Sequence, residues 1–116
     1  MNLNELEIAR DIVNTLEEMK GENILLLDIQ EIASFTDYFI ICSGTSDRML
    51  ASLAKTVVTK VKTDYGIRKI VEGEAKAGWM VIDLANIIVH LFSPDQREYY
   101  KLEQLWGEGK VLLHLQ

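Results

Sequence analysis

The chain has 116 residues, 48% of them hydrophobic and 26% charged, a composition that excludes a disordered or fibrous protein. Its length allows about two-thirds of the unfolded surface to be buried in one core but is too short for two ordinary domains. The 12 basic and 18 acidic residues give a net charge of −6, which excludes a positive field over the whole molecule for holding nucleic acid and favours a basic partner.

The cysteine content limits the chemistry of the chain. Cys42 is its single cysteine, so an intrachain disulfide and a zinc site with several thiolates are excluded. The first residues are acidic, unlike a signal peptide, and no apolar run approaches the roughly 20 residues that span a bilayer. We therefore expect one domain over residues 1–116, soluble and cytoplasmic, with no membrane contact.

Hydrophobic spacing predicts the secondary structure in chain order. Apolar residues at steps of three and four predict a helix from about residue 3 to 20, which Gly21 ends. Two short apolar runs, 24–27 and 38–42, predict buried strands. Residues 44–47 then suit a helix start, with Ser46 or Thr45 as the N-cap.

The remaining elements lie beyond that cap. In chain order we expect a helix to Tyr65 ended by Gly66, a weak edge strand at 67–71, strands at 79–82 and 87–92 joined by a hairpin at 83–86, and a helix at 95–106 that begins beside Pro94 and is closed by Gly107. A strand–helix–strand crossover beside a hairpin predicts an α/β fold with a mixed, about five-stranded sheet flanked by helices.

A nucleotidyltransferase is the enzyme class that deserves a test, because the sequence Gly-Thr-Ser at 44–46 enters a helix directly after a strand. Such enzymes pair this turn with two carboxylates, two residues apart on a strand, that hold magnesium. Asp28 is followed two positions later by Gln30, and Asp83 by Ala85. Neither strand therefore carries the pair of acids. An active site would need two acids from distant segments, Asp28 and Asp83, to meet in space, so we expect no enzymatic activity, cofactor or metal.

Two single residues have a structural and a functional interpretation. Cys42 lies within an apolar strand, which favours a buried thiol over a reactive one. His90 alternates with Ile88 and Phe92 on one strand face. This position favours a structural hydrogen bond, or a place on a partner surface, over a general base.

Two further features leave alternatives open. Arg48, Lys55 and Lys62 recur every seven residues, which suits either phosphate contacts or a solvated helix face. No aromatic residues lie among them to stack bases, which disfavours binding of single-stranded nucleic acid. Trp79 begins its strand after a turn of small residues, so it either closes the core or anchors a partner, with Asp83 as the charge complement.

Three blocks of sequence resemble the ribosomal silencing factor family, also called RsfS or Iojap-like. They are TDYFIICSGTSDR at 36–48, then VEG at 71–73 with WMVIDL at 79–84 and VHLF at 89–92, and REYYKLEQLW at 97–106. The resemblance implies a nucleotidyltransferase-like fold that lacks the metal-binding acid pair. It also implies binding to the large ribosomal subunit at its fourteenth protein, uL14, which blocks joining of the small subunit and represses translation.

The resemblance also implies which residues contact the partner. Its Trp-x-x-x-Asp-Leu stretch falls on Trp79, Asp83 and Leu84, and we add His90 and Asn86 as candidate binding residues. Asn86 stands where the family usually has an acid, and Ala85 stands where it has a turn glycine.

Partners and rival functions follow from the same resemblance. It suggests a homodimer in the free state, and from the acidic composition we expect no sequence-specific contact with nucleic acid. The alternatives are a factor for large-subunit assembly that uses the same surface, and a residual nucleotidyltransferase-type enzyme.

Overall fold

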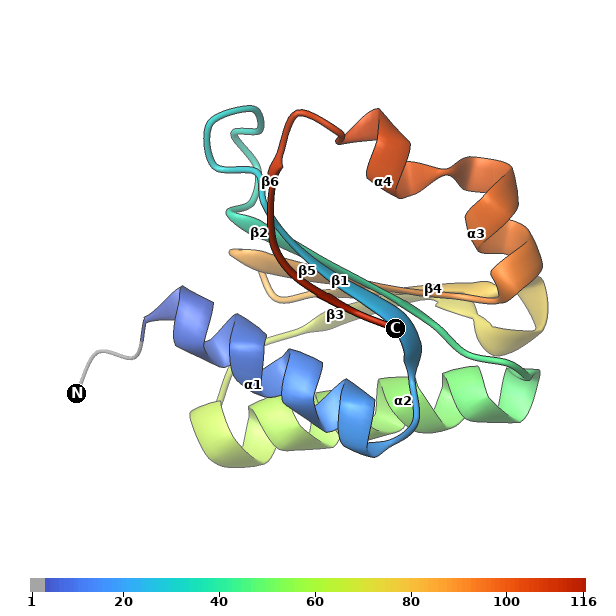
Figure 1. Ribbon diagram of the computed structural model, residues 1–116. Helices are drawn as coiled ribbons and strands as arrows, with labels where there is room; N and C mark the ends of the chain where they lie inside the picture. Colours follow the sequence, from blue (N-terminus) through green and yellow to red (C-terminus); the bar gives the residue numbers. More distant parts are fainter. Residues whose placement is uncertain (1–3) are drawn as a thin grey trace.

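The computed structural model describes residues 4–116, which form one six-stranded sheet with helices on both faces (Figure 1). In chain order the elements are α1 (Glu5–Glu18), β1 (Glu22–Asp28), β2 (Tyr38–Ser43), α2 (Asp47–Lys60), the π-helical turn η1 (Val61–Tyr65), β3 (Ile70–Glu74), the 3-10 turn η2 (Ala75–Ala77), β4 (Trp79–Asp83), β5 (Ile87–Phe92), α3 (Pro94–Tyr100), α4 (Leu102–Leu105) and β6 (Lys110–Leu115). Over this range no helix combines the length and the apolar character that crossing a bilayer requires.

The strand order is β3-β4-β5-β2-β1-β6, and it confirms a mixed α/β fold. β2 and β5 are parallel, with Tyr38 opposite Ile87, whereas the other neighbouring strands are antiparallel. The parallel pair requires a long crossover, which α2, β3 and β4 provide. The hairpin expected between β4 and β5 is also confirmed.

The prediction of about five strands was wrong, because β6 adds a sixth strand at the edge of the sheet. It pairs antiparallel with β1 and places His114 opposite Leu25. Gly109 permits the turn before it, since a Cβ there would lie 3.1 Å from the Asp28 carbonyl oxygen. Every side chain of β6 stays at least partly exposed, so the strand has no fully buried apolar run to reveal it.

Two of the predicted helices are interrupted. The second helix is α-helical only to Lys60 and continues as η1 until Gly66, whose φ of 63° ends it. The last helix is divided by Lys101, which has a φ of 49°. This break brings Glu103 within 2.9 Å of the buried Arg97 guanidinium.

The other boundaries differ less from the predictions. The weak strand is β3, at the edge of the sheet as expected but shifted to Ile70–Glu74. The first helix begins after Asn4, whose Oδ1 accepts a hydrogen bond from the Leu6 amide at 2.8 Å. Its expected start at residue 3 lies outside the described residues. Ser46 caps α2, because its Oγ accepts a hydrogen bond from the Met49 amide at 3.1 Å.

The sheet separates two hydrophobic cores. α1 and α2 cover one face, and α3 and α4 lie over the other (Figure 1). The core beneath α1 and α2 is the larger one and buries Cys42 completely. Burial raises the pKa of this thiol to about 12, which confirms the prediction of a buried cysteine. The smaller core, beneath α3 and α4, comprises Leu25, Leu27, Ile29, Phe39, Ile41, Phe92 and Leu102.

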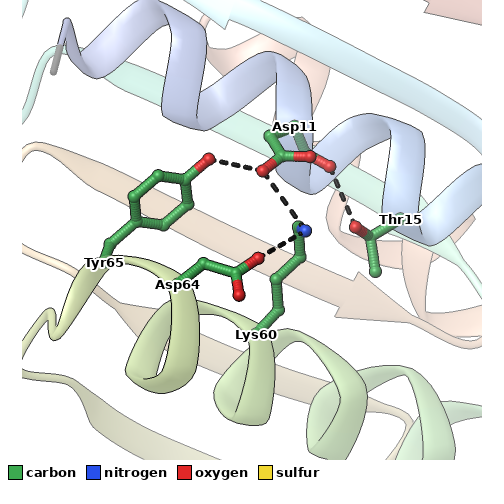
Figure 2. Close-up of polar contacts among 5 residues, drawn as sticks. All are labelled: Asp11, Thr15, Lys60, Asp64 and Tyr65. Carbon is green, nitrogen blue, oxygen red and sulfur yellow. Dashed lines mark hydrogen bonds and ion pairs between the residues drawn. The ribbon is translucent and has the colours of Figure 1, made fainter.

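A polar clamp of Asp11, Lys60, Asp64 and Tyr65 joins α1 to the end of α2 (Figure 2). Asp11 accepts a hydrogen bond from the Tyr65 hydroxyl and lies 3.2 Å from the Lys60 ammonium, which also contacts Asp64 at 2.9 Å. The hydrogen bond to Asp11, with burial, raises the pKa of Tyr65 to about 12. The clamp therefore fixes the π-helical turn against α1.

Candidate protein-binding surface

Trp79 is the first residue of β4, on the sheet face that carries the smaller core. Its indole Nε1 donates a hydrogen bond to His90 Nδ1 at 3.2 Å. The ring stacks on Phe92 with centroids 4.9 Å apart and contacts Tyr100 at 4.5 Å. Trp79 is only half-buried: one side of the indole packs against the smaller core, as the structural alternative predicts, and the rest reaches the surface, where a role as a partner anchor stays a prediction.

His90 lies beneath Trp79 and is 7% exposed. Burial lowers its pKa to about 4, so the imidazole is neutral at physiological pH. Since Nδ1 accepts the indole N–H, the proton lies on Nε2, which has no hydrogen-bond partner among the described residues. The ring also meets Phe39 edge-on at 4.8 Å. His90 therefore holds the indole from below and presents little surface of its own.

The turn between β4 and β5 places the other candidate residues apart from Trp79. Asp83 Oδ1 accepts a hydrogen bond from the Ala85 amide at 2.8 Å, and Ala85 has a φ of 73°. Leu84 is 6% exposed and packs in the larger core, beneath α1 and α2. Asn86 is exposed, and its Nδ2 donates to Glu5 Oε1 in α1 at 3.1 Å.

The structure thus brings together only some of the candidate residues. Trp79 and His90 are in contact, and Asp83 shares their face at the other end of β4, about 13 Å along the strand. Leu84 and Asn86 point elsewhere, so their contribution is to hold the turn: Leu84 anchors it in the core and Asn86 ties it to α1.

Further residues on this face were missed by the sequence analysis. Directly paired residues point to the same side of a sheet, so the register places Ile70 beside Asp83, Glu72 beside Val81 and Glu74 beside Trp79. We define the docking face as Ile70, Glu72, Glu74, Trp79, Val81, Asp83 and Ile88. The alternation of an apolar residue with glutamates in β3 is the signal that could have revealed it.

The docking face combines apolar and acidic groups. Ile70 is 58% exposed, both glutamates of β3 are exposed, and Val81 and Ile88 are half-buried. Next to it Tyr99 and Tyr100 of α3 are also exposed. A half-buried tryptophan among apolar residues, with carboxylates at the rim, is the arrangement expected where a basic protein docks.

The carboxylates of a nucleotidyltransferase site do not meet. Asp28 pairs with Tyr38, Tyr38 with Ile87, and Asp83 with Ile88. Asp28 and Asp83 are therefore three strand spacings apart, or about 14 Å, whereas paired metals lie about 4 Å from each other. Within residues 4–116, moreover, no three His, Cys, Asp or Glu side chains gather in a way that could hold a metal ion.

Comparison with known proteins assigns the family. Residues 2–115 match the family described as "Ribosomal silencing factor during starvation". "Ribosomal silencing factor RsfS" of Bacillus subtilis is 36% identical over 110 residues, covering 94% of this chain and 92% of that protein. The mouse "Mitochondrial assembly of ribosomal large subunit protein 1" is 31% identical over 82% of this chain and 43% of its own length.

Solved structures agree with this result. A crystal structure of a Chromobacterium violaceum protein superimposes with a TM-score of 0.85 at 32% identity, over 90% of this chain and 88% of that one. The sequence match spans nearly the whole chain, and the fold matches over 90% of it. The chain therefore belongs to the ribosomal silencing factor family.

Proposed function

We propose that this protein binds the large ribosomal subunit through its docking face, contacts uL14 there, and sterically blocks joining of the small subunit. The whole chain acts as a single domain. It inhibits subunit joining by covering a surface of the large subunit, with no chemical step. The family assignment and the names of its relatives support a ribosomal role.

The observation that supports the proposal most directly is that neighbouring side chains hold the Trp79 indole in a fixed position. Its indole N–H is already bonded to His90, and its ring rests on Phe92 and Tyr100. A partner therefore meets a fixed aromatic surface and orders little on binding, which is the situation of an interface hot spot. The rim acids Glu72, Glu74 and Asp83 add attraction to a basic protein surface.

Sedimentation of purified subunits tests the proposal. The protein is expected to co-sediment with large subunits and to reduce the amount of joined ribosomes when small subunits are added. Trp79→Ala is expected to weaken this binding by about 2 kcal/mol, or about 30-fold. Trp106→Ala is the matched control, because Trp106 packs against the same core but lies outside the docking face.

Two results would contradict the proposal in different ways. Wild-type protein that sediments with neither subunit removes the ribosomal function altogether. A folded Trp79→Ala variant that binds as tightly as wild type removes the docking face but not the function. Circular dichroism of both tryptophan variants shows whether each is folded.

A second candidate function, assembly of the large subunit, is favoured by the name of the mouse relative. The two functions differ in the particle that is bound. A silencing factor binds mature large subunits and prevents joining, whereas an assembly factor prefers precursor particles. The same sedimentation assay with precursor and mature particles in competition distinguishes them.

A further inference from the structure

Charge is unevenly distributed along this acidic chain. Residues 48–69 contain six basic residues and one acid, a net charge of +5, whereas the rest of the chain contains six basic and 17 acidic residues, a net charge of −11. This basic segment comprises α2, η1 and the start of the connection to β3. The docking face contributes three of the acids in the remainder.

Three basic residues of α2 and η1 form one exposed stripe. Arg48 and Lys55 are seven residues apart in α2, so they lie within about 20° of each other around the helix, and Lys62 follows seven residues later in η1. All three are exposed, whereas Leu50, Leu53, Ala54, Val57 and Val61 turn toward the sheet. Lys60 belongs to the clamp on the side facing α1, outside the stripe.

In the described part of the chain no ion pair neutralises the stripe, although Glu18 and Asp64 line the same hollow as Lys55. None of its three cations forms an ion pair with any residue from 4 to 116, although Lys60, Arg97, Lys101 and Lys110 all do. Its exposed neighbours Ala51, Thr59 and Thr63 are small, so the surface offers no apolar anchor and no aromatic ring. A row of cations without anchors suits a regular anionic polymer better than a folded protein partner.

The stripe and the docking face lie on opposite sides of the sheet. α2 covers the face away from α3 and α4 (Figure 1). Trp79, in contrast, contacts Tyr100 of α3. One molecule can therefore present its acidic face to a protein and its basic helix to a second surface at the same time. On a ribosomal particle, the abundant anionic surface is the RNA backbone.

We propose that the stripe of Arg48, Lys55 and Lys62 contacts the phosphate backbone of ribosomal RNA while the docking face binds a ribosomal protein. The choice of RNA rests on the proposed function. The contact is not sequence-specific, since no side chain of the stripe combines with an aromatic or amide group that reads bases. It adds affinity that depends steeply on salt.

The test compares two charge-reversed variants of equal net charge. Lys55→Glu/Lys62→Glu changes the stripe, and Arg10→Glu/Lys20→Glu changes two exposed basic residues in and after α1. Each protein is titrated with deproteinised large-subunit RNA at increasing potassium chloride, and with intact large subunits. Vesicles containing 30% phosphatidylglycerol serve as a second anionic surface.

Wild type and the α1 variant are expected to bind the RNA equally at low salt. The stripe variant is expected to bind at least about tenfold more weakly, with a salt slope smaller by about two. The proposal is overturned if wild type does not bind RNA, if the two variants behave alike, or if vesicles are bound as tightly as RNA with the same loss in the stripe variant.

Failure of the stripe is distinguishable from failure of the proposed function. Trp79→Ala leaves the stripe intact, so it is expected to bind naked RNA like wild type and to lose only the additional affinity for intact subunits. If intact subunits are bound no better than naked RNA by every protein, the proposed function fails. In that case the RNA titration still tests, independently, whether the stripe contacts the RNA backbone.

Discussion

Ala85 has a left-handed backbone conformation, with a φ of 73°, in the turn between β4 and β5. This conformation costs an L-residue about 1 to 2 kcal/mol, a cost that glycine does not have. Glycine is more flexible in the unfolded chain, which offsets part of the gain. Ala85→Gly is therefore expected to raise the free energy of unfolding by about 0.5 to 1 kcal/mol, measured by urea denaturation.

Ala51→Gly provides the matched control, because Ala51 is an exposed residue within α2. There the same substitution is expected to lower the free energy of unfolding by about 1 kcal/mol. Opposite signs for one chemical change isolate the backbone conformation as the cause. A loss of stability in Ala85→Gly would show that the turn does not strain the alanine.

Residue-scale predictions from the sequence succeeded where they depended on local periodicity. The alternation of Ile88, His90 and Phe92 placed these side chains on one face, and the apolar run around Cys42 predicted a buried thiol. The Trp79–His90 hydrogen bond was not predictable, because it joins residues 11 positions apart. It depends on the register that the turn imposes, and that register follows from packing of both strands.

At the scale of elements, strands with buried faces were predictable and the half-exposed edge was not. β1, β2 and β5 have runs of buried apolar residues, whereas β6 pairs with a strand more than 80 residues away and stays partly exposed. The division of the last helix also accompanies a tertiary contact, in which the Arg97 guanidinium donates a hydrogen bond to the Ser43 hydroxyl 54 positions earlier in the chain. Such contacts leave no local pattern in the sequence.

The contact between α1 and η1 is expected to depend on Asp11. Asp11→Ala removes the carboxylate that accepts the hydrogen bond from the Tyr65 hydroxyl and faces Lys60. Because the clamp is partly exposed, we expect a loss of about 1 kcal/mol in the free energy of unfolding. The pKa of Tyr65, now about 12, is expected to fall toward 10, which phenolate absorbance measures.

A double-mutant cycle with Tyr65→Phe supplies the control for this contact. If the hydrogen bond stabilises the helix pair, the double variant is less destabilised than the sum of the single variants, by about 1 kcal/mol. Strict additivity, with an unchanged Tyr65 titration in Asp11→Ala, would show that Asp11 and Tyr65 do not interact in solution.

For the molecule as a whole, acid stability is expected to depend on the smaller core, where His90 is buried. Its pKa is about 4 in the folded protein and about 6.5 when unfolded, so between these values the unfolded chain binds more protons. Unfolding is thereby favoured as pH falls: the stability is complete above pH 6.5 and decreases by about 3 kcal/mol toward pH 4. Protonation also removes the acceptor of the Trp79 indole.

Replacement of the histidine tests this dependence. His90→Gln cannot titrate, yet its amide oxygen can still accept the indole N–H, so the difference in free energy of unfolding from wild type is expected to shrink as pH falls from 7 to 4. Urea denaturation at several pH values measures it, because the carboxylates titrate alike in both proteins. His114→Gln is the matched control, since His114 is exposed on β6. Parallel pH profiles for wild type and His90→Gln would mean that His90 is not held neutral by burial.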